Sequence, residues 1–119
     1  MGTGRLTTHV LDTALGKPAA GVTITLYWVT GNSRAQIAQT VTNEDGRTDA
    51  PMLAGTALTA GVYELIFAAG DYLRATGQAT GNTLFLDHIP IQFGVPDADQ
   101  HYHVPLLISP FAYSTYRGS

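Results

Sequence analysis

The sequence contains no cysteine, so neither a disulfide framework nor a thiolate metal site can be proposed. Basic residues are also scarce, because 6 Lys and Arg stand against 9 Asp and Glu, for a formal net charge of −3. No basic run exists, and we therefore predict that the protein does not bind nucleic acid. An anionic ligand would therefore have to be bound by individual Lys or Arg side chains at a local site.

Long hydrophobic runs are missing as well. None approaches the roughly 20 apolar residues that a membrane-spanning helix needs, and residues 1–5 do not resemble the apolar part of a signal peptide. We therefore predict a cytoplasmic protein with no membrane partner, although a signal peptide that had been removed would leave the same sequence. No linker or repeat interrupts the 119 residues, which suit a single domain over 1–119.

Alternating side chains predict strands along most of the chain. Every second residue of 22–28 is apolar, which is the period of a half-buried strand. Residues 63–67 and 89–95 repeat this pattern, and Pro90 predicts a sheet edge for the second run because proline cannot donate to a strand ladder. Only 71–77 reads as a short helix. The spacing of the strands predicts an all-β sandwich.

Four of the residues that could carry chemistry are ambiguous when each is taken alone. His9 is more simply a structural histidine that hydrogen-bonds a neighbour. His101 and His103 lie two positions apart and would share one face of a strand. Paired histidines could bind zinc, but no carboxylate or thiolate accompanies them at ligand spacing, so a metal site is a minor alternative. Arg47 follows a predicted turn, where an arginine is usually exposed to solvent.

The C-terminal segment concentrates polar chemistry where a chain end normally carries none. It reads Tyr-Ser-Thr-Tyr-Arg-Gly-Ser over residues 113–119, and the two histidines lie one short hairpin away. Hydroxyl groups, a cation and imidazoles therefore come together, which suggests a site. Strict alternation puts Tyr116 and Arg117 on opposite faces, so either the strand twists at its end or these two residues serve different sides.

Three segments together resemble one known family. They are the stretch 101–119 with its final Tyr-Arg-Gly-Ser, the stretch 6–21 that contains His9, and the turn Thr-Asn-Glu-Asp-Gly-Arg over 42–47. These segments resemble the 5-hydroxyisourate hydrolases, the transthyretin-related enzymes of urate degradation. Transthyretins proper share part of the C-terminal segment but do not end in Tyr-Arg-Gly-Ser, so the last four residues favour the enzymes over the carriers.

The resemblance implies a transthyretin-like sandwich of eight strands in two sheets, with one short helix. The strands are expected near residues 5–12, 21–30, 34–42, 51–54, 61–68, 88–95, 101–109 and 112–118. It also implies that edge strands pair between subunits and that the protein is a homotetramer, a dimer of dimers with a channel between them.

The implied reaction converts 5-hydroxyisourate to 2-oxo-4-hydroxy-4-carboxy-5-ureidoimidazoline, by attack of water on a cyclic amide and without a cofactor. His9, Arg47 and His103 match the family's catalytic positions. We expect His103 to be the general base and His9 to be its partner or the proton donor to the leaving nitrogen. Arg47 is expected to stabilise the oxyanion.

The terminal motif supplies the predicted substrate contacts, which are Tyr116, Arg117 and Ser119. A transthyretin-like protein that binds a small ligand without catalysis is the alternative. Such a carrier would have no need of two histidines and an arginine at these matched positions, and their co-occurrence favours the hydrolase.

Overall fold

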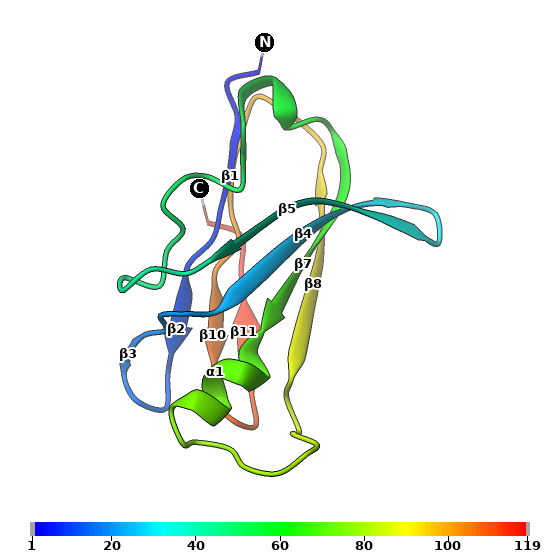
Figure 1. The fold of residues 1–119 in the computed structure, drawn as a ribbon. Coiled ribbons are helices and arrows are strands. Elements are labelled where there is room, and N and C mark those ends of the chain that lie inside the picture. The colour runs from blue at the N-terminus through cyan, green and yellow to red at the C-terminus, as the bar shows by residue number, and fades with distance from the viewer. Residues whose placement is uncertain (1, 119) are drawn as a thin grey trace.

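The computed structural model describes residues 2–118 and shows two layers of strands (Figure 1). One layer is a regular antiparallel sheet with the order β5-β4-β7-β8. Its strands are β4 (Thr23–Thr30), β5 (Ser33–Val41), β7 (Gly61–Ala68) and β8 (His88–Val95). The strand that contains Pro90 lies at the edge of this sheet, as predicted.

The other layer consists of two smaller sheets, with the orders β6-β1-β9 and β11-β10-β2-β3. Their strands are β1 (Arg5–Thr7), β2 (Val10–Asp12), β3 (Lys17–Pro18), β6 (Leu53–Ala54), β9 (His101–His103), β10 (Leu106–Ile108) and β11 (Tyr113–Thr115). Strand β1 runs parallel to β9, and β2 runs parallel to β10. The segments 5–12 and 101–108 therefore lie side by side through both sheets and form one interrupted layer.

Local hydrogen bonding explains the interruption. Pro105 has no backbone N–H, and the hydroxyl of Thr8 donates to the carbonyl of Val104 at 2.8 Å. The sandwich of the prediction is confirmed, but residues 2–118 form eleven shorter strands where eight were expected. Two of the expected strands, 5–12 and 101–109, are each divided at this point.

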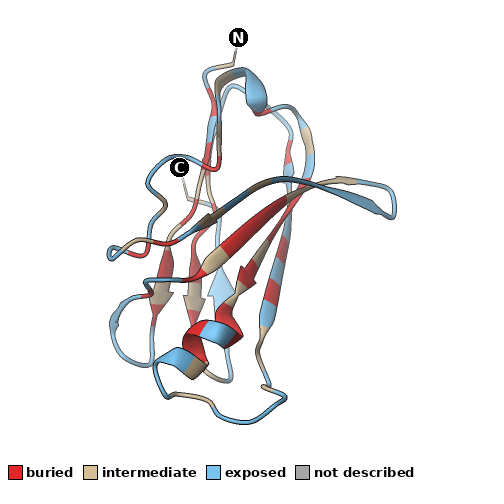
Figure 2. Cartoon of the chain, viewed as in Figure 1, coloured by how far each residue is buried: buried red, intermediate tan, exposed pale blue. Residues whose placement is uncertain are grey.

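The core lies between the two layers, where Figure 2 colours alternate residues along most of β8 as buried, whereas β4 and β7 each contain a run of three consecutive buried residues. Leu26 and Phe67 represent the regular sheet, and Leu106 and Ile108 face them from the interrupted layer; all four are 0% exposed. The apolar residues of the predicted alternation therefore point into the core, but only β8 alternates with exposed residues, because Thr25 of β4 and Glu64 of β7 are buried as well.

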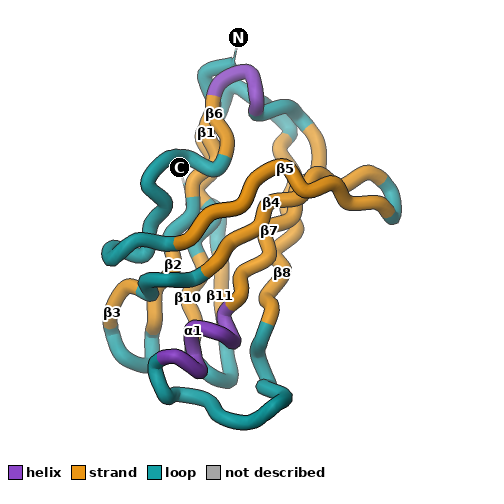
Figure 3. The backbone as a smooth tube through the Cα atoms, viewed as in Figure 1, coloured by secondary structure: helices purple, strands orange, loops and turns teal. Residues whose placement is uncertain are grey.

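Helix α1 (Ala69–Ala75) begins two residues before the predicted range. Its Tyr72 donates a hydrogen bond of 2.6 Å to the buried carboxylate of Asp12 on β2. Burial opposes ionisation of Asp12, but this bond and those from two backbone N–H groups and Gln78 outweigh burial, so the pKa of Asp12 is lowered. A loop over 76–87 then leads to β8 (Figure 3), and a single 3₁₀ turn, η1 (Gly55–Ala57), precedes β7. None of the helices within residues 2–118 has the length and apolar character to cross a membrane.

Candidate active site

The outer face of the interrupted layer carries His103. Its neighbours Tyr102 and Val104 are buried in the core, so strand alternation turns His103 outward. Thr7 pairs with it in register across β1 and β9, and the Thr7 hydroxyl lies 2.9 Å from His103 Nδ1. Within residues 2–118 no protein group hydrogen-bonds Nε2. When Nδ1 donates to Thr7, Nε2 therefore keeps its lone pair for a proton from water.

His9 lies two residues beyond Thr7 on the same face, and its tautomer is set by the turn that follows β5. His9 Nε2 lies 2.8 Å from the backbone carbonyl of Asp45. Because a carbonyl oxygen only accepts, Nε2 of neutral His9 must carry the proton and Nδ1 must hold the lone pair. His9 can thus accept a proton at Nδ1 without losing its anchor.

Arg47 forms an isolated antiparallel bridge with His9. The side-chain oxygen of Asn43 accepts hydrogen bonds from the backbone N–H groups of Asp45 and Arg47, which fixes this turn. Gly46 adopts a φ of +76°, and a Cβ at this position would lie 2.3 Å from the carbonyl oxygen of Val10. Glycine is therefore required for the close approach that places Arg47 beside His9.

Charge links the three predicted catalytic residues. Burial lowers the pKa of His103 below its ordinary value, and the positive charges of Arg47 and His9 lower this pKa further. His103 therefore stays neutral, and able to accept a proton, at lower pH than a free histidine. A surface cavity of 150 Å³ adjoins Arg47 and is also lined by Thr7 and Thr8, the residues before His9, although neither histidine lines it.

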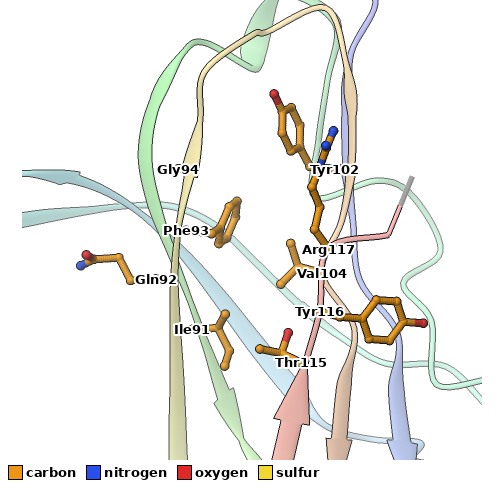
Figure 4. Close-up of a pocket in the computed structure, with 9 residues that line it drawn as sticks. All are labelled: Ile91, Gln92, Phe93, Gly94, Tyr102, Val104, Thr115, Tyr116 and Arg117. Atoms are coloured by element: carbon orange, nitrogen blue, oxygen red, sulfur yellow. The ribbon is translucent and has the colours of Figure 1, made fainter.

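The terminal segment reaches this face through Gly118. Its N–H donates to the carbonyl of His103 at 2.7 Å, and the return bond is 3.4 Å long. Tyr116 and Arg117 extend in different directions from the backbone (Figure 4), as strict alternation requires. Strand alternation places Tyr116, which is 59% exposed, on the side of His103. The terminal strand does not twist out of register, and Ser119 lies outside the described residues.

Arg117 points to the opposite side, where it contacts the segment 100–102. Its Nη2 donates to the side chain of Gln100 at 3.0 Å and to the carbonyl of His101 at 3.2 Å. Its guanidinium also lies over the ring of Tyr102, 4.6 Å from the centroid. The sequence did not predict these contacts of Arg117. It did not predict the hydrogen bond between Thr7 and His103 either, although Thr7 shares a strand face with His9.

The remaining histidines do not join this cluster. His88 begins β8 and His101 is exposed on β9. Across residues 2–118 there is no group of three or more His, Cys, Asp or Glu side chains arranged to hold a metal ion.

Comparison with known proteins identifies the family. Residues 6–118 match the model of the HIUase/Transthyretin family. The chain belongs to this family. It is 61% identical over 116 residues to the 5-hydroxyisourate hydrolase of Mesorhizobium japonicum, an alignment that covers 98% of this chain and 93% of that protein. The resemblance drawn from the three sequence segments is therefore confirmed.

Two solved structures show the same fold. (S)-allantoin synthase superposes with a TM-score of 0.93 at 45% identity, and covers 99% of this chain, which spans only 44% of that longer chain. Sea bream transthyretin in complex with thyroxine superposes with a TM-score of 0.84 at 29% identity, over 96% of this chain and 94% of that one. The predicted transthyretin-like sandwich is confirmed by these likenesses.

Proposed function

We propose that the protein is a 5-hydroxyisourate hydrolase, which opens the substrate to 2-oxo-4-hydroxy-4-carboxy-5-ureidoimidazoline in urate degradation. The observation that carries this function is the meeting of His9, Arg47 and His103 on one face of the sandwich, in a chain 61% identical to a protein of that name. A carrier of small ligands has no use for a base whose pKa is lowered beside an arginine and a second histidine.

The proposed chemistry begins at Nε2 of His103. Nδ1 donates to Thr7, and Nε2 takes a proton from water as the oxygen attacks the ring carbonyl. Negative charge then develops on the carbonyl oxygen, where the planar donors of Arg47 can stabilise it. The bond between carbonyl carbon and ring nitrogen breaks, and the nitrogen receives the proton that His103 took from water, either directly or by way of Nδ1 of His9. This order of proton transfers is part of the proposal.

The substrate contacts are proposed from the terminal motif. Alternation from Gly118, which pairs with His103, puts Tyr116 on the side of His103, where it offers a phenol to the substrate ring. Ser119 was predicted to join it and remains a proposed contact. Arg117, the third predicted contact, has its guanidinium on the other side of the strand in this single chain. We propose that the reaction needs no cofactor, because water, two imidazoles and a guanidinium account for every transfer above.

The decisive experiment follows the spectrum of freshly generated 5-hydroxyisourate with and without the protein. We expect decay well above the spontaneous rate, and a His103→Asn variant should lose at least about 10²-fold in kcat/KM because asparagine cannot accept a proton. Equal decay with and without the wild-type protein would instead favour the carrier function, for which binding of thyroxine-like aromatic ligands is the corresponding assay.

We also propose that the protein assembles as a homotetramer, a dimer of dimers. Strands β8 and β11 are the outer strands of their sheets among residues 2–118, and each leaves an edge open to pairing. Phe85 and Phe111 lie on the surface, 74% and 76% exposed, with ring centroids 6.0 Å apart. An exposed aromatic pair of this kind is typical of an interface.

Light scattering at the assay concentration tests the assembly. A tetramer is expected, and a fully active monomer would exclude it as a requirement for the site. The cytoplasmic location and the single domain over 1–119 stay predictions.

A further inference from the structure

Gly118 packs directly against the imidazole of His103. A Cβ at position 118 would lie 2.9 Å from Cδ2 of His103 and 3.0 Å from its Cβ. The φ of Gly118 is not in the left-handed region, so contact with His103, rather than backbone strain, restricts this position to glycine. The terminal backbone therefore forms one wall of the space in which the imidazole sits, and the Thr7 hydroxyl anchors Nδ1 on β1.

Arg117 fixes the backbone that carries this wall. Its guanidinium bonds to the side chain of Gln100 and the carbonyl of His101, and it stacks over Tyr102. These three residues immediately precede His103 on the chain. Arg117 thus links the last residues of the chain to β9 from one side, while Gly118 pairs with the backbone of His103 itself.

We propose that Arg117 and Gly118 are positioning residues, which lock the imidazole of His103 in its catalytic orientation instead of binding substrate. This inference rests on the proposed hydrolase function and assigns a role to two members of the terminal motif. The planar fork and the flat face of arginine suit this task, because lysine can neither bond two acceptors in a fixed geometry nor stack on a ring in the same way.

The first test replaces Gly118 with alanine. The added methyl group must displace the imidazole or the terminal backbone, and we expect kcat to fall about 10-fold or more while KM changes less than about 2-fold. Gly94→Ala is the matched control, because a Cβ at Gly94 would meet nothing within 4 Å and the φ of Gly94 lies outside the left-handed region. Subunit mass is measured for both variants, so that lost assembly is not mistaken for lost positioning.

The second test separates a positioning role from a substrate contact and does not depend on whether Gly118→Ala folds. Gln100→Ala removes a hydrogen-bond acceptor of the Arg117 guanidinium without changing Arg117 itself, and Arg117→Lys replaces the planar guanidinium with a single ammonium group. If Arg117 acts through β9, both variants should lower kcat with little change in KM. The double variant should be no worse than Arg117→Lys alone, because the two act as one unit.

NMR titration of His103 without substrate supplies a readout that is independent of activity. Arg47 and His9 are the charged groups that face this imidazole, and both remain in every variant. In Gly118→Ala and Arg117→Lys the His103 pKa should rise towards its ordinary value as the ring gains water. Gly94→Ala should leave it unchanged.

Three results would overturn the proposal. One is wild-type kcat in a folded Gly118→Ala protein. Another is an Arg117→Lys variant that changes only KM while Gln100→Ala has no kinetic effect, because this would mean that Arg117 contacts the substrate directly. The third is an unchanged His103 pKa in both positioning variants. If the wild-type protein itself does not accelerate decay, the hydrolase function fails, while the titration still decides whether Arg117 and Gly118 hold the imidazole.

Discussion

The two layers of this sandwich are built differently, and the difference separates stability from chemistry. The regular sheet uses strands of 8 or 9 residues that pair antiparallel along most of their length, with one register shift between β4 and β5. The interrupted layer uses strands of 2 or 3 residues, and His103 lies where β9 stops. Every described residue assigned to the reaction belongs to the interrupted layer or to the loop beside it.

The interruption explains why a site can form there. A continuous ladder satisfies its backbone groups within the sheet, whereas the break at residues 104–105 leaves edges to which other segments can attach. The Arg47 turn uses one such edge to pair with His9, and Gly118 uses another to pair with His103. Three segments distant in sequence are thereby fixed around one imidazole, and the regular sheet behind them supplies a rigid, well-packed support.

Removal of residues 116–119 should have the largest effect on activity. It deletes the phenol of Tyr116, the Arg117 contacts and the Gly118 pairing, yet it removes none of the buried side chains of the core. We expect a folded sandwich whose hydrolase rate is close to the spontaneous rate. Circular dichroism, subunit mass and the decay assay check this together, and a truncated tetramer with wild-type turnover would exclude the terminal motif from the site.

A core substitution in the regular sheet should do the reverse. Phe67 on β7 is 0% exposed, and Phe67→Ala leaves a cavity that should lower the free energy of unfolding by about 3–5 kcal/mol. Denaturant titration measures this loss. In conditions where the variant is fully folded we expect kcat within about 2-fold of wild type, because Phe67 lies on β7, in the layer that carries none of the site residues. A large loss of kcat in the folded variant would mean that the two layers are not separable.

The dependence on pH should come from the interrupted layer. Burial, Arg47 and His9 lower the His103 pKa, so kcat/KM should decline, by up to about 10-fold per pH unit, below the ordinary histidine value of about 6.5. The unfolded chain binds this proton more readily than the folded one, so the contribution of His103 to stability is lost as the pH falls through the same window. A rate that does not change from pH 7 to 5 would count against a histidine base.

Sequence patterns predicted the regular sheet better than the interrupted layer. Alternating apolar residues predicted the positions of β4, β7 and β8 closely, because a long strand with one face in the core has an apolar side chain at every second position. The divisions of 5–12 and 101–109 were missed. Pro105 was a local signal for the second division, whereas the bond from the Thr8 hydroxyl to a carbonyl 96 positions away has no local signature. The helix was found but placed two residues late, because Asp71 lies inside its first turn.

The site was predicted by resemblance and only in part by residue type. The positions of His9, Arg47 and His103 came from three matched segments, but their meeting depends on parallel pairing between the two ends of the chain. The side-chain direction of Arg117 followed from alternation, whereas its partners did not. Stacking on Tyr102 requires a known register between β9 and the terminus, and periodicity alone does not supply one.

A matched pair of substitutions should produce the smallest effects and still distinguish the layers. Thr7→Val removes the hydroxyl that lies 2.9 Å from His103, and Thr25→Val on β4 removes the hydroxyl that accepts a 3.0 Å bond from Gln39. Each change keeps the side-chain shape and should cost about 0.5–1.5 kcal/mol of stability, the usual net value of one such hydrogen bond.

The kinetics of the pair should diverge. Without Thr7 the His103 ring loses the hydrogen-bond partner that holds its orientation, so we expect kcat to fall several-fold in Thr7→Val, whereas Thr25→Val should keep wild-type kcat and KM. Steady-state kinetics and denaturant titration on both variants supply the measurement. An equal fall of kcat in both variants would mean that the loss of any side-chain hydrogen bond in the sandwich slows the reaction. Wild-type kcat in both variants would mean that Gly118 and the terminal strand orient His103 without Thr7.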